Sequence, residues 1–393
     1  MTMADFSFIA PRKIIFGPGT LAKLGGIAAG FGKKTLLIRN PSVSRNSVQW
    51  NSICQSLNGG SIRFHTLEVH GEPSPELVDA AVRDYGKSGI EAVISIGGGS
   101  VIDAGKAISA MLPTGGPVAD YLEGIGTKTH PGTKVPFIAV PTTAGTGSEA
   151  STNTVLSRVG SPGGFKKSLR HENLAPDVAL VDPELALSCP APVTAACGMD
   201  AFTQLLEAYV SPRASSVTDA LVESALPYVR DCLVAAATGG AGDVSMRAGM
   251  AYAALVSGIA LANAGLGVVH GLASSLGGHL AIPHGVVCGT LIGKASEVTI
   301  EALKKNGANH PVLAKYARAG AIVSGKITDD IDAGCSALTG AIRSWTETLK
   351  LPLISEFGMT RSDVEKIAAE TGCRNNPIAL SPGQIAEILL SRL

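Results

Sequence analysis

The sequence of 393 residues is longer than one hydrophobic core usually supports, so we expect two domains of ordinary size. Lys plus Arg and Asp plus Glu number 32 each, a balance that argues against a nucleic-acid or anionic-membrane binder and favours small uncharged partners. Glycine is abundant, with 47 residues, and only 16% of residues are charged, which indicates a surface partly covered by another subunit. We therefore expect a homo-oligomer, most simply a dimer.

Cysteine usage and the amino-terminal residues indicate the compartment. The seven cysteines are an odd number and form no Cys-x-x-Cys pair, which is typical of reduced, buried thiols. The first residues lack the basic start and apolar run of a secretory signal, and no window approaches about 18 uninterrupted apolar residues. The sequence thus predicts a cytoplasmic protein without a membrane span.

The first half of the chain alternates short β-branched runs with helical patterns, as in "KKTLLIRN" (33–40), "EAVISIGGG" (91–99) and "KVPFIAVPTT" (134–143). This alternation predicts an α/β domain with a parallel, Rossmann-like sheet that is covered on both faces. From about residue 195 onward, Ala- and Leu-rich windows with helical spacing predict an all-α domain. The Pro-rich segment between them places the boundary between 1–188 and 189–393.

The first candidate ligand site is a glycine turn after a predicted strand. Gly97, Gly98 and Gly99 precede a helix that starts near Ser100, so the backbone can approach a ligand and offer helix N–H groups to a pyrophosphate. The spacing is not Gly-x-Gly-x-x-Gly, and a plain tight turn is the alternative. Asp103 and Lys106, three residues apart, are interpreted either as a surface ion pair or as a cofactor neighbour and a support for the loop.

A second loop, "PTTAGTGSEAS" (141–151), also follows a predicted strand. Four hydroxyls of this loop can donate to phosphate or ribose, those of Thr142, Thr143, Thr146 and Ser148, whereas the alternative is a turn that bonds to itself. Ligands of open α/β sheets bind at the carboxyl ends of strands, where both loops would lie. The pair of loops favours a nucleotide.

The second candidate site is a metal centre in the helical half. His270 and His284 are 14 residues apart, but Gly277, Gly278 and Pro283 interrupt the helix and allow the chain to turn back. Asp200 and Gln204 lie at i and i+4, on one face of an earlier helix. One carboxylate and two imidazoles form a plausible three-ligand set.

Each of these residues also has a plainer interpretation. Asp200 follows a glycine and can serve as a helix cap. His279 is best interpreted as a hydrogen-bonded core residue. Glu207, one turn after Gln204, is a partly buried helix residue or the partner of a ligand.

The segments that carry the candidate groups are "GGGSVIDAGKA", "PTTAGTGSEAS", "GMDAFTQLLEAYVS" and "GLGVVHGLASSLGGHLAIPHG". Together, and in this order, they resemble the iron-containing alcohol dehydrogenase family, and the likeness extends from residue 13 to residue 389. The resemblance implies an α/β domain that binds NAD or NADP, a helical domain that binds a divalent metal, a cleft between them and a dehydroquinate synthase-like architecture.

The resemblance also assigns roles to individual residues. It implies that Asp200, His270 and His284 occupy three of the family's four metal-ligand positions. It implies cofactor contacts at Gly98, Gly99 and Ser100 for the pyrophosphate, Asp103, Thr142, Thr143 and Thr146 around the cofactor, and Lys167 near the ribose.

The chain departs from the family pattern at three positions. Gln204 stands where most members have the fourth ligand, a histidine; it can bind through its carbonyl, leave a three-ligand zinc site as in glycerol dehydrogenases, or mark a metal-free site as in maleylacetate reductases. Ser274 stands where many members have a histidine that helps proton transfer. Asn40 replaces an aspartate of NAD-preferring members, so with Arg39 beside it we expect relaxed discrimination against NADP.

The resemblance implies reversible hydride transfer between a small alcohol and the nicotinamide, with Fe²⁺ or Zn²⁺ as Lewis acid. Retention of three ligands favours a metal. The alternatives are a metal-free NAD(P)H reductase, a cyclising lyase resembling dehydroquinate synthase, and a nucleotide-binding sensor without turnover. "DAFTQLLEAYV" lacks the Lys and Arg cluster that the anionic substrate of the lyase would require.

Overall fold

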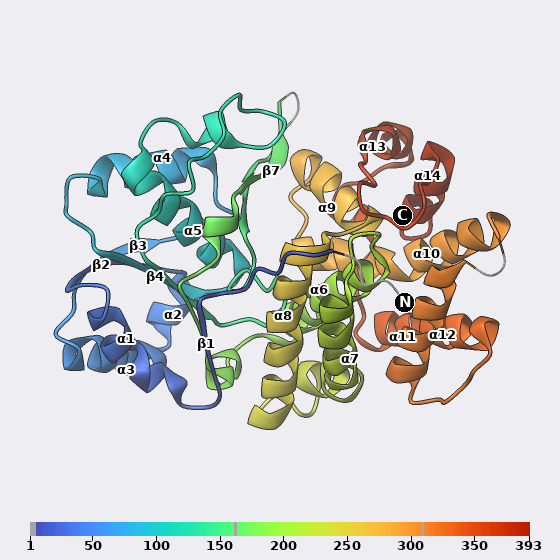
Figure 1. Cartoon of the computed structure of the whole chain (residues 1–393), viewed down its shortest axis with the longest axis horizontal. Helices are drawn as coiled ribbons and strands as arrows, with labels where there is room; N and C mark the ends of the chain where they lie inside the picture. Colours follow the sequence, from blue (N-terminus) through green and yellow to red (C-terminus); the bar gives the residue numbers. More distant parts are fainter. Residues whose placement is uncertain (1–4, 161–162, 308–309) are drawn as a thin grey trace. The chain divides into compact units, whose positions relative to one another are not determined.

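The computed structural model describes residues 5–160, 163–307 and 310–393. These residues form two compact units (Figure 1). The α/β unit comprises Ile9–Arg158 and Lys166–Cys189, and the helical unit comprises Pro190–Leu393 with the described residues of Met1–Phe8 and Val159–Phe165. The main division lies one residue from the predicted boundary, but the grouping of two short earlier segments with the helical unit was not predicted.

A six-stranded sheet in the order β1-β8-β5-β4-β2-β3 forms the centre of the α/β unit. Neighbouring strands run parallel, as predicted. The central strands β4, β5 and β8 are buried along their whole length, as expected where helices cover both faces. The six strands are β1 (Lys13–Phe16), β2 (Lys34–Arg39), β3 (Arg63–Glu68), β4 (Ala92–Gly97), β5 (Phe137–Pro141) and β8 (Val178–Val181).

The two faces of the sheet are packed differently. Side chains of α1 and α3 form a hydrophobic core with alternate residues of β4, among them Ile94 and Ile96. Ser95 points to the other face, where a Cβ atom at Gly105 of α5 would lie 1.9 Å from its hydroxyl, so this glycine allows α5 to lie directly on the strand. The α-helices of this unit are α1 (Leu24–Ala29), α2 (Pro41–Arg45), α3 (Ser47–Gly59), α4 (Pro75–Tyr85) and α5 (Gly99–Thr114).

Short elements complete the α/β unit. A separate two-stranded sheet of β6 (Asn153–Arg158) and β7 (Phe165–Arg170) was not predicted. Short 3-10 helices are η1 (Thr20–Lys23), η2 (Val118–Tyr121), η3 (Glu172–Leu174) and η4 (Pro183–Ala186).

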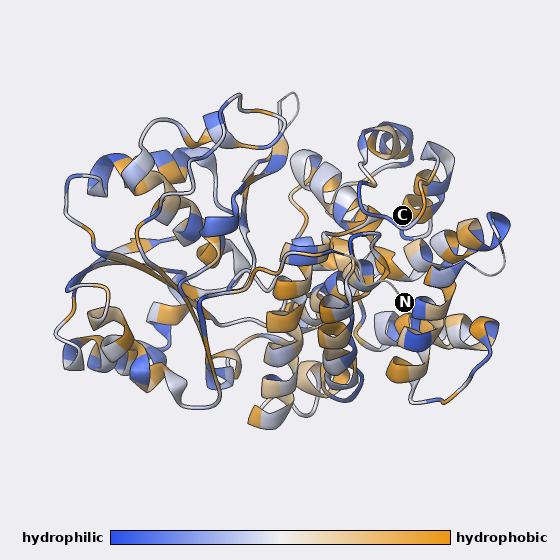
Figure 2. Cartoon of the chain, viewed as in Figure 1, coloured by the Kyte–Doolittle hydropathy of each residue, from blue (hydrophilic) through white to orange (hydrophobic). Residues whose placement is uncertain are grey.

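The helical unit is built around α6 (Ala191–Val210), which is buried from Met199 to Val210 without a break. Helices α7 and α8 pack against it and against each other, and Figure 2 shows hydrophobic residues along all three. The prediction of an all-α domain is confirmed for the described residues of Pro190–Leu393, which form helices and no strands. The remaining helices are α7 (Ser216–Ala237), α8 (Val244–Ala264), α9 (Val268–His279), α10 (His284–Lys305), α11 (Pro311–Ser324), α12 (Ile331–Thr348), η5 (Ile354–Phe357), η6 (Arg361–Asp363), α13 (Val364–Glu370) and α14 (Pro382–Leu390).

One helix among the described residues, α8, is long and apolar enough to cross a membrane by length and composition. However, 67% of its most apolar window is buried inside the protein, and it packs on α6 and α7. We therefore interpret α8 as a core helix. All seven cysteines are free, as predicted, although four of them are only partly buried.

The hairpin of α9 and α10 differs in detail from the prediction. Helix α9 continues through Gly277 and Gly278 and ends at His279, so these glycines do not break it. The turn consists of Leu280–Pro283, and Pro283 is the N-cap of α10. A proline suits this place because its fixed φ leads into the helix and its missing N–H has no partner in a first turn.

Candidate functional site

The close packing of α10 on α6 determines where the candidate ligands lie. Gly285 and Gly289 are one turn apart on α10, and a Cβ atom at either position would lie 2.6 Å from an atom of α6. Real Cβ atoms do not approach so closely, so these two glycines allow the helices to touch. His284 and Cys288, each next to one of the glycines, are thereby brought to the level of Asp200 on α6.

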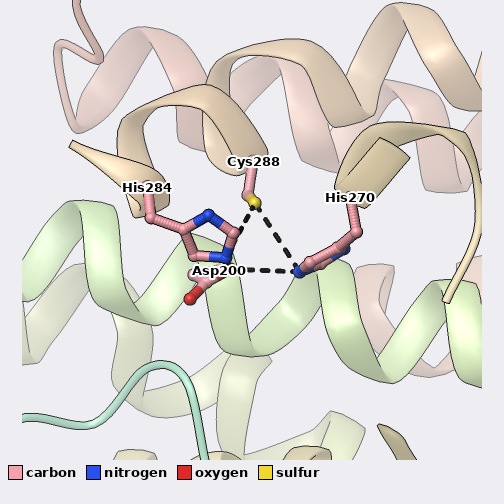
Figure 3. Close-up of side chains that lie close together, drawn as sticks. All are labelled: Asp200, His270, His284 and Cys288. Atoms are coloured by element: carbon pink, nitrogen blue, oxygen red, sulfur yellow. Dashed lines mark hydrogen bonds and ion pairs between the residues drawn. The ribbon is translucent and has the colours of Figure 1, made fainter. Parts of the chain in front are cut away.

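Asp200, His270 and His284 converge on one point inside the helical unit (Figure 3). The Nε2 atoms of the two histidines lie 3.5 Å and 3.6 Å from Asp200 Oδ1. The ring centroids of the histidines are 5.4 Å apart. The structure thus brings together the carboxylate and the two imidazoles that the sequence singled out, and their binding of a metal stays a prediction.

Cys288 joins this group, although sequence reasoning missed it. Its Sγ lies 3.6 Å from His270 Nε2 and 3.8 Å from His284 Nε2, and the side chain is fully buried. One ligand atom from each of the four residues lies within 4.8 Å of the other three. A signal was present in the sequence, because Cys288 follows His284 by four residues and so lies on the same face of a helix.

Glu207 orients His270. Its Oε2 accepts a hydrogen bond of 2.7 Å from His270 Nδ1, and its Oε1 accepts one of 2.7 Å from the backbone N–H of Val269. With Nδ1 donating to the carboxylate, the lone pair of Nε2 is directed at the cluster, as in histidines that bind metals. Glu207 is therefore a hydrogen-bond partner of His270, and the ligand role of His270 stays a prediction.

The electrostatics of the cluster reflect burial and close neighbours. Burial alone would raise the pKa of Asp200, but His284 and His270 beside it hold that pKa below its usual value. Burial would lower the pKa of His270, but Cys288, Asp200 and Glu207 together raise it well above its usual value. Burial also raises the pKa of the Cys288 thiol to about 12. The lowered pKa keeps the buried carboxylate of Asp200 ionised, and a cation can neutralise this charge.

The residues fit a divalent metal ion on two observations. Asp200 Oδ1 is buried and, within the part of the chain that the structure describes, has no hydrogen-bond donor at bonding distance. The donor set of carboxylate, imidazoles and thiol is typical of zinc and related transition metals. A cation at the centre of the cluster would satisfy the carboxylate oxygen.

Two further residues that the sequence singled out, Gln204 and His279, lie on the helices that carry Asp200 and His270. Gln204, which stands at the family's fourth ligand position, lies one turn beyond Asp200 on α6 and is 2% exposed, and its part in metal binding stays a prediction. His279 Nε2 donates a hydrogen bond of 2.9 Å to Glu370 Oε2. It is hydrogen-bonded as expected, but its side chain is 25% exposed and so does not belong to the core.

The two predicted nucleotide loops lie side by side at the carboxyl ends of β4 and β5. The N–H of Thr142 donates to Gly97 O at 2.9 Å, and a Cβ atom at Gly99 would lie 2.5 Å from Thr146 Oγ1. Gly98 is the N-cap of α5 and provides no side-chain cap, so the helix start offers its N–H groups to an anion. The predicted cofactor residues gathered here are Gly97, Gly98, Gly99, Ser100, Thr142, Thr143 and Thr146.

Asp103 and Lys106 of α5 form hydrogen bonds with the second loop. Asp103 accepts a hydrogen bond from Ser148, and Lys106 Nζ lies 2.7–3.2 Å from five oxygens of Ser148, Ser151 and Asn153. Lys106 is 1% exposed, so the interpretation as a surface ion pair is wrong. The lysine does support a loop, but it is the second loop and not the glycine turn. A role of Asp103 at the cofactor stays a prediction.

Asn40 caps the start of α2, directly after β2. Its Oδ1 is buried and has no hydrogen-bond partner among the described residues. Arg39 pairs with Glu68 and stacks on Trp50 at 4.6 Å from the ring centroid. Because Glu68 compensates the charge of Arg39, relaxed discrimination against NADP depends mainly on the neutral Asn40.

Lys167 lies on β7, where side chains alternate between the two faces. Its side chain is exposed, whereas that of Lys166 is buried and pairs with Glu72. Of the two neighbouring lysines, Lys167 is thus the one that is accessible to a ligand, and its contact with the ribose stays a prediction.

Comparisons with known proteins agree with this arrangement. A family model described as iron-containing alcohol dehydrogenase matches residues 11–183, and one described as the C-terminal part of the Fe-containing alcohol dehydrogenase family matches residues 194–393. The two matches correspond to the α/β and the helical parts of the chain.

Individual relatives cover most or all of the chain. An NAD-dependent methanol dehydrogenase of Bacillus methanolicus is 30% identical over 100% of both chains. A 1,3-propanediol dehydrogenase of Citrobacter freundii is 35% identical over 74% of this chain and 75% of its own length. The crystal structure of a 1,3-propanediol oxidoreductase is 27% identical, with a TM-score of 0.88 over 99% of this chain and 100% of the other.

Proposed function

The chain belongs to the iron-containing alcohol dehydrogenase family and is a nicotinamide-dependent, metal-dependent oxidoreductase of alcohols, and we propose that it interconverts a short primary alcohol and its aldehyde at Asp200, His270 and His284. The observation that carries this proposal is the convergence of two imidazole Nε2 atoms on one buried carboxylate oxygen, at 3.5 Å and 3.6 Å.

Oxidation of a primary alcohol removes one hydride from carbon and one proton from oxygen. When bound, the nicotinamide accepts the hydride, and the divalent metal supplies a Lewis acid at the substrate oxygen. Asp200, His270 and His284 would hold the metal, and Glu207 keeps the His270 ring in the required orientation. The alcohol proton leaves through water, because Ser274 is exposed and its hydroxyl is a weak acid and base.

The cofactor site we propose is the pair of loops at the ends of β4 and β5, together with Asn40 at the end of β2. The glycine turn and the start of α5 would bind the pyrophosphate. Asn40 is neutral, so it does not repel a 2′-phosphate as a carboxylate would, and we expect measurable use of NADPH beside NADH.

The substrate class we propose is that of short, uncharged alcohols and aldehydes. Support comes from the relatives, which include a methanol dehydrogenase and a 1,3-propanediol dehydrogenase. The equal numbers of basic and acidic residues also give no reason to expect a highly charged substrate.

We further propose that the protein acts as a cytoplasmic homodimer. Support comes from β1, an edge strand of the sheet on which Ile14 and Phe16 are each 39% exposed. An edge strand with exposed apolar side chains favours pairing with another chain. Sedimentation equilibrium of the purified protein tests this, and a monomer at micromolar concentration would contradict it.

The activity is tested by incubating the protein with Zn²⁺ or Fe²⁺, NADH or NADPH, and a panel of short aldehydes while following the absorbance of the reduced cofactor. We expect consumption of cofactor that the His270→Ala variant loses together with the bound metal. The control variant His279→Ala removes a histidine outside the cluster and should retain both. Turnover by a protein free of metal would favour a metal-free reductase, and silence across the whole panel would favour a nucleotide-binding sensor.

A further inference from the structure

We propose that Cys288 is a fourth protein ligand of the metal and that the resulting tetrahedral site, with Asp200, His270 and His284, selects zinc over ferrous iron. The proposal rests on the metal-binding role proposed above for the other three residues. Nothing in the family resemblance pointed to Cys288, and it comes only from the packing of α10 on α6.

Four of the six distances among the donor atoms match a tetrahedral ion, and the other two are at most 4.8 Å. Bonds of about 2.0–2.1 Å to nitrogen or oxygen and about 2.3 Å to sulfur place neighbouring ligand atoms of a tetrahedron about 3.3–3.6 Å apart, whereas neighbouring ligands of an octahedral ion would lie only about 3.0 Å apart. The four measured separations are 3.5, 3.6, 3.6 and 3.8 Å. They are longer than the octahedral spacing and close to the tetrahedral one.

The two distances from Asp200 Oδ1 to the histidines are long for hydrogen bonds. A charge-assisted N–H···O bond is normally about 2.7–2.9 Å long, and the bond from His270 to Glu207 has that length, 2.7 Å. By contrast, the contacts of Asp200 Oδ1 with His270 and His284 are 3.5 Å and 3.6 Å. The ring of His270 is thus hydrogen-bonded on its Nδ1 side and spaced for a shared ion on its Nε2 side.

The chemistry of the donor set decides which ion is favoured. A thiolate is a soft ligand, and tetrahedral sites that combine sulfur and imidazole are typical of zinc. Binding forms a sulfur–metal bond and breaks the S–H bond of Cys288, with the proton passing to solvent. Because the thiol is fully buried among the other three ligands, no movement of α10 is needed to bring the sulfur to the ion.

A ligand role for Cys288 also changes the role expected of Gln204. An amide oxygen is a harder and weaker ligand for zinc than a thiolate. A site completed by Cys288 does not require the side chain of Gln204, so the loss of a histidine at position 204 is compensated from the neighbouring helix.

The experiment uses the full-length protein, stripped of metal by a chelator and reloaded with one equivalent of Co²⁺ as a spectroscopic substitute for zinc. We expect intense visible bands of tetrahedral Co²⁺ and a near-ultraviolet sulfur-to-cobalt charge-transfer band. The Cys288→Ser variant should lose the charge-transfer band and bind Zn²⁺ at least about tenfold more weakly in competition with a chromophoric chelator.

Two control variants accompany it. Cys335→Ser removes another buried thiol of the helical unit, on α12 and outside the cluster, and should leave the charge-transfer band and the zinc affinity unchanged. Gln204→Leu should also keep the band, because the amide is not the fourth ligand. Circular dichroism of each variant identifies one that fails to fold, and Cys288→Ala then replaces Cys288→Ser.

The outcomes separate this proposal from the proposed function. Two outcomes overturn the role of Cys288 even if aldehyde reduction is observed. One is wild-type protein that binds Co²⁺ without a charge-transfer band, and the other is a band that is lost in Gln204→Leu and kept in Cys288→Ser. A band that depends on Cys288 supports the site even if the aldehyde panel is silent, in which case the proposed function alone fails. Higher affinity for Fe²⁺ than for Zn²⁺ under anaerobic conditions overturns the selectivity.

Discussion

Glu207 holds His270 through two hydrogen bonds of 2.7 Å, one to Nδ1 of the ring and one to the backbone N–H of Val269. A single carboxylate therefore fixes both the imidazole and the first turn of the helix that carries it. Both donors need an acceptor, and only an ionised carboxylate offers one oxygen to each. The orientation of the candidate ligand is thus built into the contact between α6 and α9.

The Glu207→Gln variant tests this contact. An amide has one acceptor oxygen and one donor group, so the new side chain can accept from the ring or from the backbone N–H but opposes the other donor. We expect the zinc affinity to fall by about 10- to 100-fold, as for other partners that orient metal ligands. Competition with a chromophoric chelator measures this, with Glu301→Gln, an exposed site on α10, as the control. Equal affinities for the two variants would show that Glu207 does not position the ligand.

Gly289→Ala tests the packing of α10 on α6. The added Cβ atom would lie 2.6 Å from Met199 Cβ, so α10 must move or a side chain must shift. We expect a loss of about 1–3 kcal/mol in unfolding free energy together with weaker metal binding. Gly340→Ala is the matched control, since among the described residues no atom lies within 4 Å of its added Cβ atom and helix propensity favours alanine on α12. Thermal unfolding compares the two, and a Gly289→Ala variant as stable as Gly340→Ala would contradict the close approach.

Glu149 makes stability depend on pH. Burial raises the pKa of its carboxyl from 4.5 to about 7 in the folded protein. The folded state therefore favours the protonated form, and the stability that is fully present below pH 4.5 is lost as the pH rises through 7. We expect Glu149→Gln to remove this dependence, so that it is more stable than wild type by roughly 3 kcal/mol at pH 7.5 and equal to it at pH 4.5.

Urea unfolding at several pH values between 4.5 and 7.5 measures this difference. Burial lowers the pKa of Lys106 to about 8, so this lysine titrates above the chosen range. A difference between the two proteins that does not change with pH would show that Glu149 is ionised throughout.

Asn40→Asp tests the basis of cofactor choice. A carboxylate at this position repels a 2′-phosphate and can bond the ribose hydroxyls, so we expect the ratio of kcat/KM for NADPH to that for NADH to fall at least about tenfold. Asn58→Asp introduces the same charge at an exposed site on α3 and should leave the ratio unchanged. A wild-type enzyme that already uses NADPH a thousandfold less efficiently than NADH would refute the role given to Asn40.

The parts of the fold that follow local patterns were predictable. The strand ending in Gly97 is almost continuously apolar and is followed by glycines. Neighbouring residues alone therefore predict that the strand is buried and that a helix follows it. By contrast, β7 carries three basic residues and, among the strands that the structure describes, pairs only with β6, and nothing local distinguishes it from a loop.

The candidate site was predictable only where a spacing rule applied. Asp103 and Lys106 have the spacing of an exposed pair on a helix, but oxygens of residues 148–153, more than 40 positions away, surround the lysine. Similarly, Cys288 has the pattern of an ordinary buried thiol. Its place beside Asp200 depends on the approach of two helices at Gly285 and Gly289, which no local pattern encodes.

The α9–α10 hairpin carries three of the four donor atoms, at His270, His284 and Cys288, whereas Asp200 lies 70 positions before the first of them. The entropy lost on closing a loop grows with the logarithm of its length, so a cation restricts the unfolded chain most through its bond to Asp200. An ion in this place works as a cross-link between distant parts of the chain, and chelation should loosen the anchoring of the hairpin before the rest of the helical unit melts.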